Sequence, residues 1–259
     1  MFDFSGKVTL ITGASYGLGE QFAYAFAEAG SDLILTARSE DALAMVAEKC
    51  RVKGRKVTAI TGDVSVETDV LNVITRGIEE HDRVDVLINN AGIGKSAPFH
   101  RLDSSLWNDV IGLNLTGTFL CTQQVFSDMR EAGYGRIVNI SSTVGLRGYP
   151  YIAAYCASKH GVVGLTRTLA LETIKKGITV NAICPGYTDT DLVSEAVDSI
   201  VDKTGKDRNE IQTEIDNMSP MGRMVDPEEV AEATAWICLP SSASITGQAI
   251  VIAGGAVMN

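Results

Sequence analysis

Short runs of apolar, largely β-branched residues alternate along this chain with longer stretches in which apolar positions have a helical spacing. Seven such runs are found, at 7–12, 32–37, 56–61, 84–89, 136–140, 178–184 and 249–253. They are apolar at nearly every position and not only at alternate ones, which predicts strands buried on both faces. Strands separated by helices join in parallel through right-handed crossovers. The pattern predicts an α/β fold: a single doubly wound, Rossmann-like domain with a seven-stranded parallel sheet and helices on both faces.

The rhythm gives no reason to divide the 259 residues into several domains. No Pro/Ser-rich linker, shift in composition or internal repeat separates its parts, so residues 1–259 are expected to form one domain. One stretch, at about 187–221, breaks the rhythm with two acidic helical patterns and no strand. It follows the sixth strand, at the sheet edge where ligands bind in such folds. We interpret it as a substrate lid, with a purely structural insertion as the alternative.

Charge and composition narrow the choice of partners. The formal net charge is −10, which argues against nucleic acid, because phosphate neutralisation needs clustered Lys and Arg. No apolar run approaches the roughly 18 residues of a membrane helix, and Asp3 and Lys7 interrupt the N-terminal segment, so neither a membrane span nor a signal peptide is expected. The five cysteines are scattered and the three histidines share no metal-ligand spacing. We therefore expect a cytoplasmic protein with reduced thiols and no metal.

A glycine-rich turn follows the first predicted strand and opens a helix that runs to about residue 29. It reads TGASYGLG over residues 12–19. Glycines permit a tight turn, close approach of the backbone to a pyrophosphate, and packing of the helix on the strand. The helix N-terminus then presents free N–H groups to the phosphates. In this context the turn predicts a dinucleotide cofactor, with contacts at Gly13, Ser15, Tyr16, Gly17, Leu18 and Gly19.

The end of the second predicted strand bears on which dinucleotide binds. An NAD site usually carries a carboxylate there for the ribose 2′-OH, whereas this chain has Ala37 followed by Arg38 and Ser39. Arg38 can pair with a 2′-phosphate, and Ser39 can hydrogen-bond it. NADP(H) is therefore favoured as the cofactor, with NAD(H) as the alternative.

A tyrosine and a lysine provide candidate chemistry. Tyr155 and Lys159 are four residues apart, which places them on one face of a predicted helix. Hydride transfer to a ketone needs a proton donor for the developing alkoxide. A cation about 4 Å away is worth up to about 4 kcal/mol, which would lower the pKa of the tyrosine by up to roughly 3 units. Alone, such a pair is more often an ordinary surface pair, so its significance depends on Ser141 or Ser142 and on Asn114. The Asn114 amide could hold a water beside the lysine, or could serve only in helix packing.

Together these motifs resemble the short-chain dehydrogenase/reductase family over the whole chain. The matching pieces are TGASYGLG, GDV (62–64), NNAG (89–92), Asn114, NISS (139–142), YCASK (155–159) and CPG (184–186). The resemblance implies that Tyr155 is the acid/base and that Asn114 supports a proton relay. It implies that Lys159 binds the nicotinamide ribose and lowers the pKa of the tyrosine. It also points to Ser142, thirteen residues before Tyr155, as the substrate-orienting serine in preference to Ser141.

The resemblance implies further cofactor contacts, at Tyr155, Lys159, Asp63, Val64, Asn90, Ala91, Gly92, Pro185, Gly186 and Thr188. Residues 145–151 and the lid are expected on the substrate side. Members of the family usually form tetramers through long helices, which predicts a homotetramer through the helices near 105–130 and 154–176. In one departure, many NADP-dependent relatives carry a basic residue where this chain has Tyr16, so the phosphate argument rests on Arg38.

The predicted reaction is hydride transfer between NADP(H) and a carbonyl or secondary alcohol. Similarity to 3-oxoacyl and polyketide ketoreductases favours a 3-oxoacyl or 3-hydroxyacyl thioester, carried by coenzyme A or a carrier protein. A dehydrogenase of a small secondary alcohol, steroid or sugar, using NAD, is the alternative within this class. A non-catalytic nucleotide-binding regulator or partner subunit is the alternative outside it, although a protein used only for binding has no need of Ser142, Tyr155 and Lys159.

Overall fold

A computed structural model describes residues 2–258, without the side chains at 191, 192, 195, 196, 199 and 203, and contains one parallel sheet of seven strands. The strand order is β3-β2-β1-β4-β5-β6-β7, which confirms the predicted doubly wound fold. After β3 the chain crosses back over β1 and β2 to place β4 beside β1, so the order reverses between β1 and β4. In such sheets this switch point, at the carboxyl ends of the strands, is where ligands bind. The strands are β1 (Val8–Thr12), β2 (Asp32–Ala37), β3 (Val57–Thr61), β4 (Val86–Asn89), β5 (Gly135–Ile140), β6 (Ile178–Pro185) and β7 (Ala249–Ile252).

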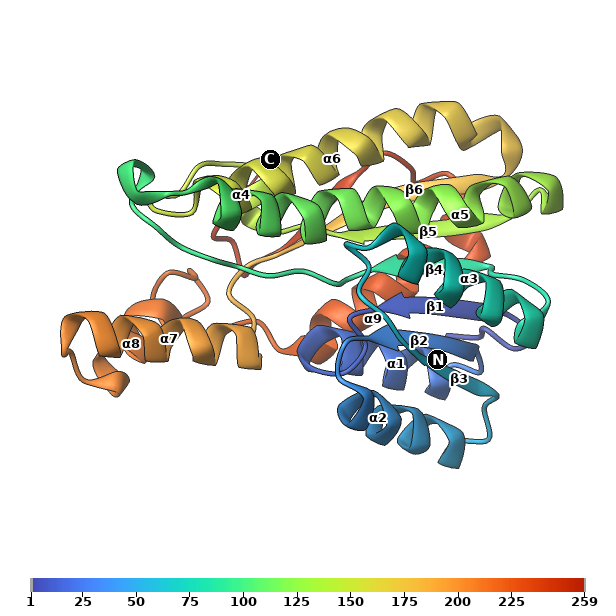
Figure 1. Cartoon of the computed structure of the whole chain (residues 1–259), viewed down its shortest axis with the longest axis horizontal. Coiled ribbons are helices and arrows are strands. Elements are labelled where there is room, and N and C mark those ends of the chain that lie inside the picture. Colours follow the sequence, from blue (N-terminus) through green and yellow to red (C-terminus); the bar gives the residue numbers. More distant parts are fainter. Residues whose placement is uncertain (1, 259) are drawn as a thin grey trace.

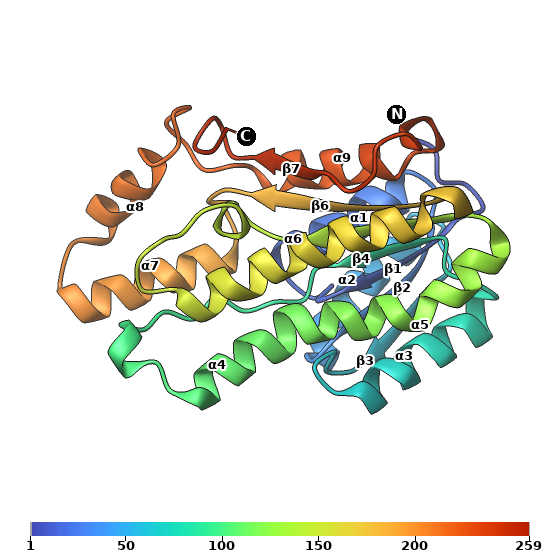
Figure 2. The same ribbon diagram turned by 90° about the horizontal axis from the view of Figure 1, so that it is seen from above.

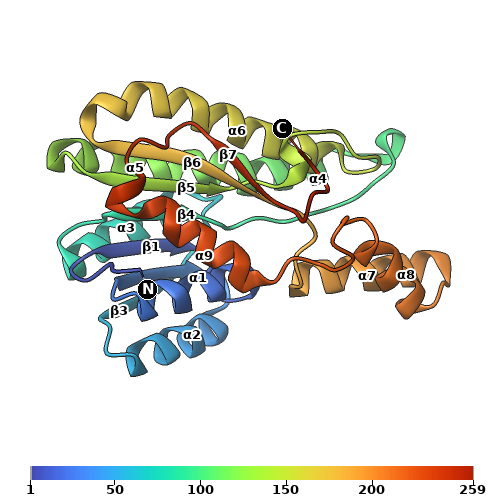
Figure 3. The ribbon, with the colours of Figure 1, turned by 180° about the vertical axis from the view of Figure 1, so that it is seen from behind.

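Helices cover both faces of the sheet (Figure 1, Figure 2). One face carries α1 (Gly17–Glu28), α2 (Glu40–Val52) and α9 (Pro227–Cys238), and Figure 3 shows α9 lying beside α1 there. The opposite face carries α3 (Glu67–His81), α4 (Ser104–Ile111), α5 (Gly117–Ala132) and α6 (Ala153–Thr173). Buried apolar side chains form a separate cluster on each face, as the uninterrupted apolar strands predict.

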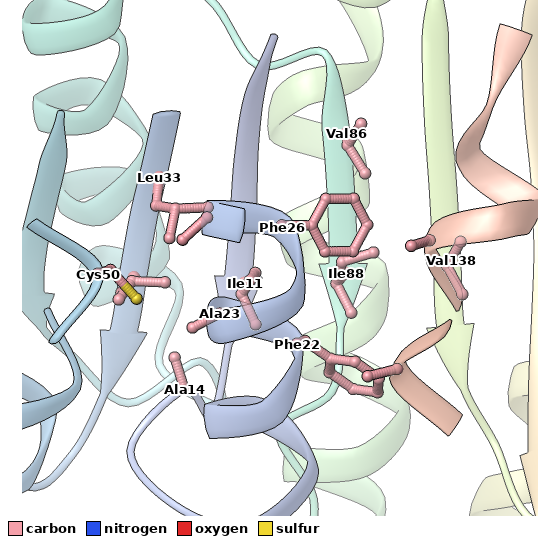
Figure 4. Close-up of a cluster of buried hydrophobic side chains, with 14 of the residues drawn as sticks. Ile11, Ala14, Phe22, Ala23, Phe26, Leu33, Cys50, Val86, Ile88 and Val138 are labelled. Carbon is pink, nitrogen blue, oxygen red and sulfur yellow. The ribbon is translucent and has the colours of Figure 1, made fainter. Parts of the chain in front are cut away.

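Helix α1 is anchored by two phenylalanines on the face that it turns toward the sheet. Phe22 and Phe26 are fully buried and lie against Ile88 and Val86 on β4 (Figure 4). The spacing of four residues places both rings on one helix face, and burial of such a side chain contributes about 1.5–3 kcal/mol. Because α1 and β1 are both packed into this cluster, the glycine turn that joins them is held at a fixed position.

The helix expected near 105–130 is interrupted. Between α4 and α5 the chain forms one π-helical turn, Gly112–Thr116, which contains Asn114. A π turn shifts the backbone hydrogen bonds by one residue and often marks a functional position. The Asn114 carbonyl accepts a hydrogen bond from the Thr118 hydroxyl at 2.8 Å. Periodicity alone did not reveal this turn, because one extra residue barely changes the apolar pattern.

The predicted insertion contains two helices and no strand, α7 (Asp191–Thr204) and α8 (Arg208–Asp216). They extend beyond the carboxyl ends of the strands (Figure 1) and have an apolar cluster of their own, formed by Val197, Ile211 and Ile215. A parallel bridge between Thr188 and Val225 joins the two ends of the insertion. Its action as a lid remains a prediction.

Candidate active site

A cleft of about 710 Å³ opens at the switch point. It is lined by the glycine turn, by the ends of β2, β4, β5 and β6, by α6 and by the start of α7. Of the residues expected in the site, it brings together Gly13, Ser15, Tyr16, Gly17, Leu18, Arg38, Ser39, Asp63, Val64, Asn90, Ala91, Gly92, Ser142, Tyr155, Lys159, Pro185, Gly186 and Thr188. Two expected residues, Gly19 and Asn114, are not part of the lining.

Glycine is required in the turn for two different reasons. Gly13 has φ of +65°, and a Cβ there would lie 2.8 Å from the Ala91 Cα, so the glycine allows the turn to pack against the end of β4. At Gly19 a Cβ would overlap the Gly13 carbonyl group and lie 2.7 Å from Asn90 Nδ2. Gly19 therefore lets α1 pack on its own turn, and the expected cofactor contact at this residue stays a prediction.

Thr12 and Asn90 lock the turn to the end of β4. The Thr12 hydroxyl accepts hydrogen bonds from the backbone N–H groups of Asn90 and Ala91, both at 3.0 Å. In return the Asn90 amide donates to the carbonyls of Thr12 and Gly13 at 3.0 and 3.1 Å. Asn90 thus lines the cleft, but its donor group is directed to the turn and shapes the cradle. Sequence reasoning did not single out Thr12, although a hydroxyl at a strand end was the available signal.

The opposite end of the cleft suits the adenosine half of a dinucleotide. Arg38 is exposed and forms no ion pair with any of the side chains that the structure describes. The Asp63 carboxylate accepts from the Ser65 N–H and hydroxyl at 2.9 and 2.6 Å, which fixes it at the wall. No side chain caps the N-terminus of α1, so its first N–H groups stay available to phosphate. The glycine cradle, the uncapped helix and the free guanidinium all fit a dinucleotide.

Asn114 holds part of the wall of the cleft by hydrogen bonds to the backbone of Ile93, a lining residue. It is 1% exposed; its Oδ1 accepts from the Ile93 N–H at 2.8 Å, and its Nδ2 donates to the Ile93 carbonyl at 3.0 Å. The same amide donates to the Ser158 hydroxyl at 3.1 Å. A Cβ on Gly92 would lie 3.2 Å from Asn114 Oδ1 and 3.6 Å from Lys159 Nζ, so the amide and the ammonium border the same space. Both amide N–H groups and the oxygen of Asn114 thus have partners within the protein, and its expected part in a proton relay stays a prediction.

Tyr155, which is half-buried, and Lys159, which is buried, lie side by side on α6. The Lys159 Nζ lies 5.6 Å from the centre of the Tyr155 ring and donates to the Ile140 carbonyl at 2.7 Å. Burial raises the pKa of Tyr155 to about 12, partly offset by the Ser142 hydroxyl, and lowers the pKa of Lys159 to about 8. In the protein by itself the pKa of the tyrosine is thus raised, because desolvation of the phenolate outweighs a cation at this separation. The lowering expected from the lysine together with the nicotinamide stays a prediction.

The two serines after β5 have different partners. The Ser141 hydroxyl is buried and donates to the Lys159 carbonyl at 3.1 Å. The Ser142 hydroxyl instead accepts from the Val144 N–H at 3.2 Å, and its own proton is directed to the Tyr155 hydroxyl oxygen or to a substrate oxygen beside it. Only Ser142 is thus equipped to donate to a substrate oxygen beside Tyr155.

Further residues line the cleft that were not selected from the sequence as catalytic or cofactor-binding. Thr190, Val193 and Ser194 come from the start of α7, so the insertion borders the cleft directly. The remainder are Thr36, Ala37, Gly62, Ile93, Leu113, Ile140 and Ser141. A position just inside a strand end or a helix start was the signal for several of them, but it does not distinguish a lining residue from a buried neighbour.

The loop expected on the substrate side, 145–151, lies outside the mapped lining. Within it, the Arg147 Nε donates to the Tyr149 hydroxyl at 2.8 Å. Tyr151 has φ of +68°, a left-handed conformation that costs a bulky residue roughly 1–2 kcal/mol. Its carbonyl accepts from the Ala97 N–H at 2.8 Å, so the loop is tied to the segment after β4.

Among the side chains that the structure describes, no group of three or more His, Cys, Asp or Glu is placed to hold a metal ion. In the same part of the chain, no helix has the length and apolar character needed to span a membrane. The chemistry of the cleft is carried by hydroxyl groups, a buried ammonium and backbone N–H groups.

Comparison with known proteins gives consistent matches. A model of the family described as short chain dehydrogenase matches residues 7–200. An acetoacetyl-CoA reductase of Rhizobium meliloti (strain 1021) is 37% identical over 249 residues, 96% of this chain and 98% of the relative. A variant of actinorhodin polyketide ketoreductase, crystallised with NADPH, has a TM-score of 0.93 at 38% identity, with 96% of this chain and 97% of that one covered. An NAD⁺-bound xylitol dehydrogenase has a TM-score of 0.92 at 33% identity, with 97% and 99% covered.

Proposed function

Because the chain belongs to the short-chain dehydrogenase/reductase family and is an NAD(P)-dependent oxidoreductase, we propose that it is an NADP(H)-dependent ketoreductase. The proposed substrates are 3-oxoacyl thioesters, reduced to 3-hydroxyacyl thioesters. The observation that carries this proposal is the position of Ser142, Tyr155 and Lys159 in the same cleft as the unpaired Arg38.

Bound NADPH would supply the hydride, and a residue of the chain supplies the proton. Tyr155 gives its phenolic proton to the oxygen of the reduced carbonyl. Burial raises the pKa of this phenol to about 12, so it is protonated at neutral pH and ready to act as a general acid. Ser142 donates a hydrogen bond to the same substrate oxygen and holds it beside Tyr155. The Lys159 ammonium stabilises the phenolate that remains, and Asn114 keeps the adjacent wall at Ile93 in place.

The proposed preference for NADP(H) is supported by the charge at the adenosine end. Arg38 is free to pair with a 2′-phosphate, and Ala37 presents no carboxylate to repel it. A similar ketoreductase was crystallised with NADPH, although a similar xylitol dehydrogenase binds NAD⁺. NAD(H) therefore stays the alternative cofactor.

The thioester class is supported by the relatives and not by any one side chain. The acetoacetyl-CoA reductase and the polyketide ketoreductase both match nearly the whole chain. We propose that residues 145–151 and the lid (187–221) border the acyl group, and that coenzyme A or a carrier protein holds the thioester. The xylitol dehydrogenase keeps a small alcohol or sugar as the second candidate substrate class.

We also propose that residues 1–259 act as one domain in a cytoplasmic homotetramer. Apolar side chains are exposed on the helices expected at the interface, with Phe119 on α5 at 43% and Leu171 on α6 at 83%. Exposed apolar patches of this kind mark association surfaces. The five cysteines are free, which suits a reducing compartment. Light scattering after gel filtration measures the state of assembly directly.

The decisive experiment follows oxidation of NADPH and of NADH at 340 nm with acetoacetyl-CoA, beside a small ketone without a thioester. We expect the thioester and NADPH to give the higher kcat/KM. Tyr155→Phe should abolish turnover, whereas Tyr24→Phe, on α1 outside the cleft, should preserve it. Faster reduction of the small ketone would favour the second substrate class. Turnover that survives in Tyr155→Phe would remove the proposed chemistry.

A further inference from the structure

Ser39 begins α2 without capping it. It occupies the N-cap position with an extended backbone (φ −86°, ψ 107°), yet no N–H of the helix donates to its hydroxyl. A serine at this position ordinarily accepts such a bond from the second or third residue of the helix. The first N–H groups of α2 are therefore left without a side-chain acceptor, and the Ser39 hydroxyl is used elsewhere.

The partner of Ser39 is Tyr16, which reaches across from the glycine turn after β1. The Tyr16 hydroxyl donates to Ser39 Oγ at 3.3 Å, and both residues line the cleft beside Arg38. Tyr16 keeps its ring 55% exposed in this position. Because Ser39 accepts from Tyr16, the proton of the Ser39 hydroxyl is free for an acceptor inside the cleft.

Positive charge at this end of the cleft is limited. Arg38 provides one positive charge to the lining. Glu40 and Asp41, in the first turn of α2, are exposed outside the lining and reduce the net positive potential around it. Uncharged hydrogen-bond donors consequently have a large share in how tightly the phosphate is held.

We propose that Tyr16 is a positioning residue for cofactor choice. By donating to Ser39 it directs the Ser39 hydroxyl proton to the 2′-phosphate of NADP(H), in the role that a second basic residue would otherwise fill. The inference rests on the NADP(H) preference proposed above. Hydrogen bonds in series strengthen one another, and a bond to an ionised acceptor is stronger than one to a neutral group. NADH, which has a 2′-hydroxyl in place of the phosphate, gains little from this pair.

The test measures the Kd of NADPH and of NADH by fluorescence of the bound nicotinamide, without any substrate. The variants are Tyr16→Phe, Ser39→Ala and the double variant, with thermal melting as a check on folding. Tyr24→Phe is the matched control, because it removes a phenolic hydroxyl from α1 that donates to Glu20 and lies outside the cleft. We expect Tyr16→Phe to weaken NADPH binding about 3- to 10-fold and Ser39→Ala about 10-fold. The double variant should bind NADPH no more weakly than Ser39→Ala, and the Kd of NADH should change less than about 2-fold throughout.

The outcomes separate this inference from the proposed function. A wild-type protein that binds NADH as tightly as NADPH overturns both the proposed cofactor preference and the proposed role of Tyr16. A wild-type preference for NADPH that persists unchanged in Tyr16→Phe overturns only the role of Tyr16. A double variant whose loss of NADPH binding free energy equals the sum of the two single losses also overturns it. If Tyr16 acts through Ser39, removing the Tyr16 hydroxyl has no further effect once the Ser39 hydroxyl is gone.

Discussion

The ammonium group of Lys159 lies 2.7 Å from the carbonyl oxygen of Ile140, at the end of the neighbouring strand β5. No carboxylate pairs with this lysine in the part of the chain that the structure describes. A buried cation with only a carbonyl as partner is held at a cost in stability. The burial of Lys159 should therefore affect the free energy of unfolding as well as the activity.

The first prediction concerns stability and pH. Burial lowers the pKa of Lys159 from 10.5 to about 8, so between these values the unfolded chain binds more protons than the folded one. Stability from this group therefore rises with pH from about 8 to 10.5, and is least below pH 8. Lys159→Met should raise the free energy of unfolding at pH 7 by about 1–3 kcal/mol while abolishing activity.

Urea unfolding of wild type and Lys159→Met at pH 7 and pH 9.5 checks this prediction. The difference in the free energy of unfolding between the two proteins should be smaller at pH 9.5, because the wild-type lysine is then largely neutral in the folded state. A Lys159→Met protein that is less stable than wild type at pH 7 would show that desolvation is not the dominant effect.

The second prediction concerns the glycine turn. Gly19→Ala places a methyl group on the Gly13 carbonyl, and such overpacking costs about 1–3 kcal/mol. We expect weaker binding of both NADPH and NADH, because the cradle itself is displaced. Gly94→Ala is the control, since its Cβ would meet nothing within 4 Å. Equal behaviour of the two variants in melting and cofactor binding would contradict the assigned role of Gly19.

The third prediction uses the strained backbone at Tyr151. Glycine tolerates a φ of +68° better than alanine by about 1 kcal/mol, so Tyr151→Gly should be more stable than Tyr151→Ala. Both variants lose the same ring, so that loss cancels in the comparison. At Leu171, an exposed position in α6, the order should reverse, with alanine better by about 1 kcal/mol. Denaturant unfolding of all four variants decides the matter, and alanine superior at both sites would exclude a left-handed Tyr151.

The fourth prediction separates Asn114 from its neighbour Ser158. Asn114→Asp keeps an acceptor for the Ile93 N–H but loses the donor to the Ile93 carbonyl. It also buries a carboxylate beside that carbonyl, so we expect a loss of about 2–4 kcal/mol in stability and at least 100-fold in kcat. Ser158→Ala removes the 3.1 Å bond from the Asn114 amide and the 2.8 Å bond that the Ser158 hydroxyl donates to the Tyr155 carbonyl, but leaves Ile93 paired, and should cost about 1–2 kcal/mol. If the two variants were equally active, Asn114 would have no special part in holding the wall.

The sequence was sufficient to predict the strands and the glycine turn, because both depend on local patterns. Strand β2 is found at the predicted residues 32–37, since an uninterrupted apolar run between polar segments leaves no other register. Gly13 and Arg38 could be placed because their roles depend on position relative to strand ends.

The remaining features depend on contacts between distant segments. The spacing of Tyr155 and Lys159 predicts a shared face, but not that both groups are buried deeply enough for desolvation to control the pKa. The pairing of Asn114 with Ile93 spans 21 residues and two elements. The link from Tyr16 to Ser39 joins two loops that meet only after β1 and β2 have paired.

The bridge between Thr188 and Val225 has a consequence for how the protein could acquire new specificity. The two ends of the insertion leave the main body side by side, with the Asp189 N–H bonded to the Val225 carbonyl at 3.0 Å and the Val225 N–H to the Tyr187 carbonyl at 2.8 Å. Closing a loop at a fixed base costs only about 0.6 kcal/mol for each doubling of its length. A change in the length of the segment between these bonds therefore costs little at its base, and recombination or design can alter it while the sheet stays unchanged, provided that Thr190, Val193 and Ser194 keep their part of the cleft lining.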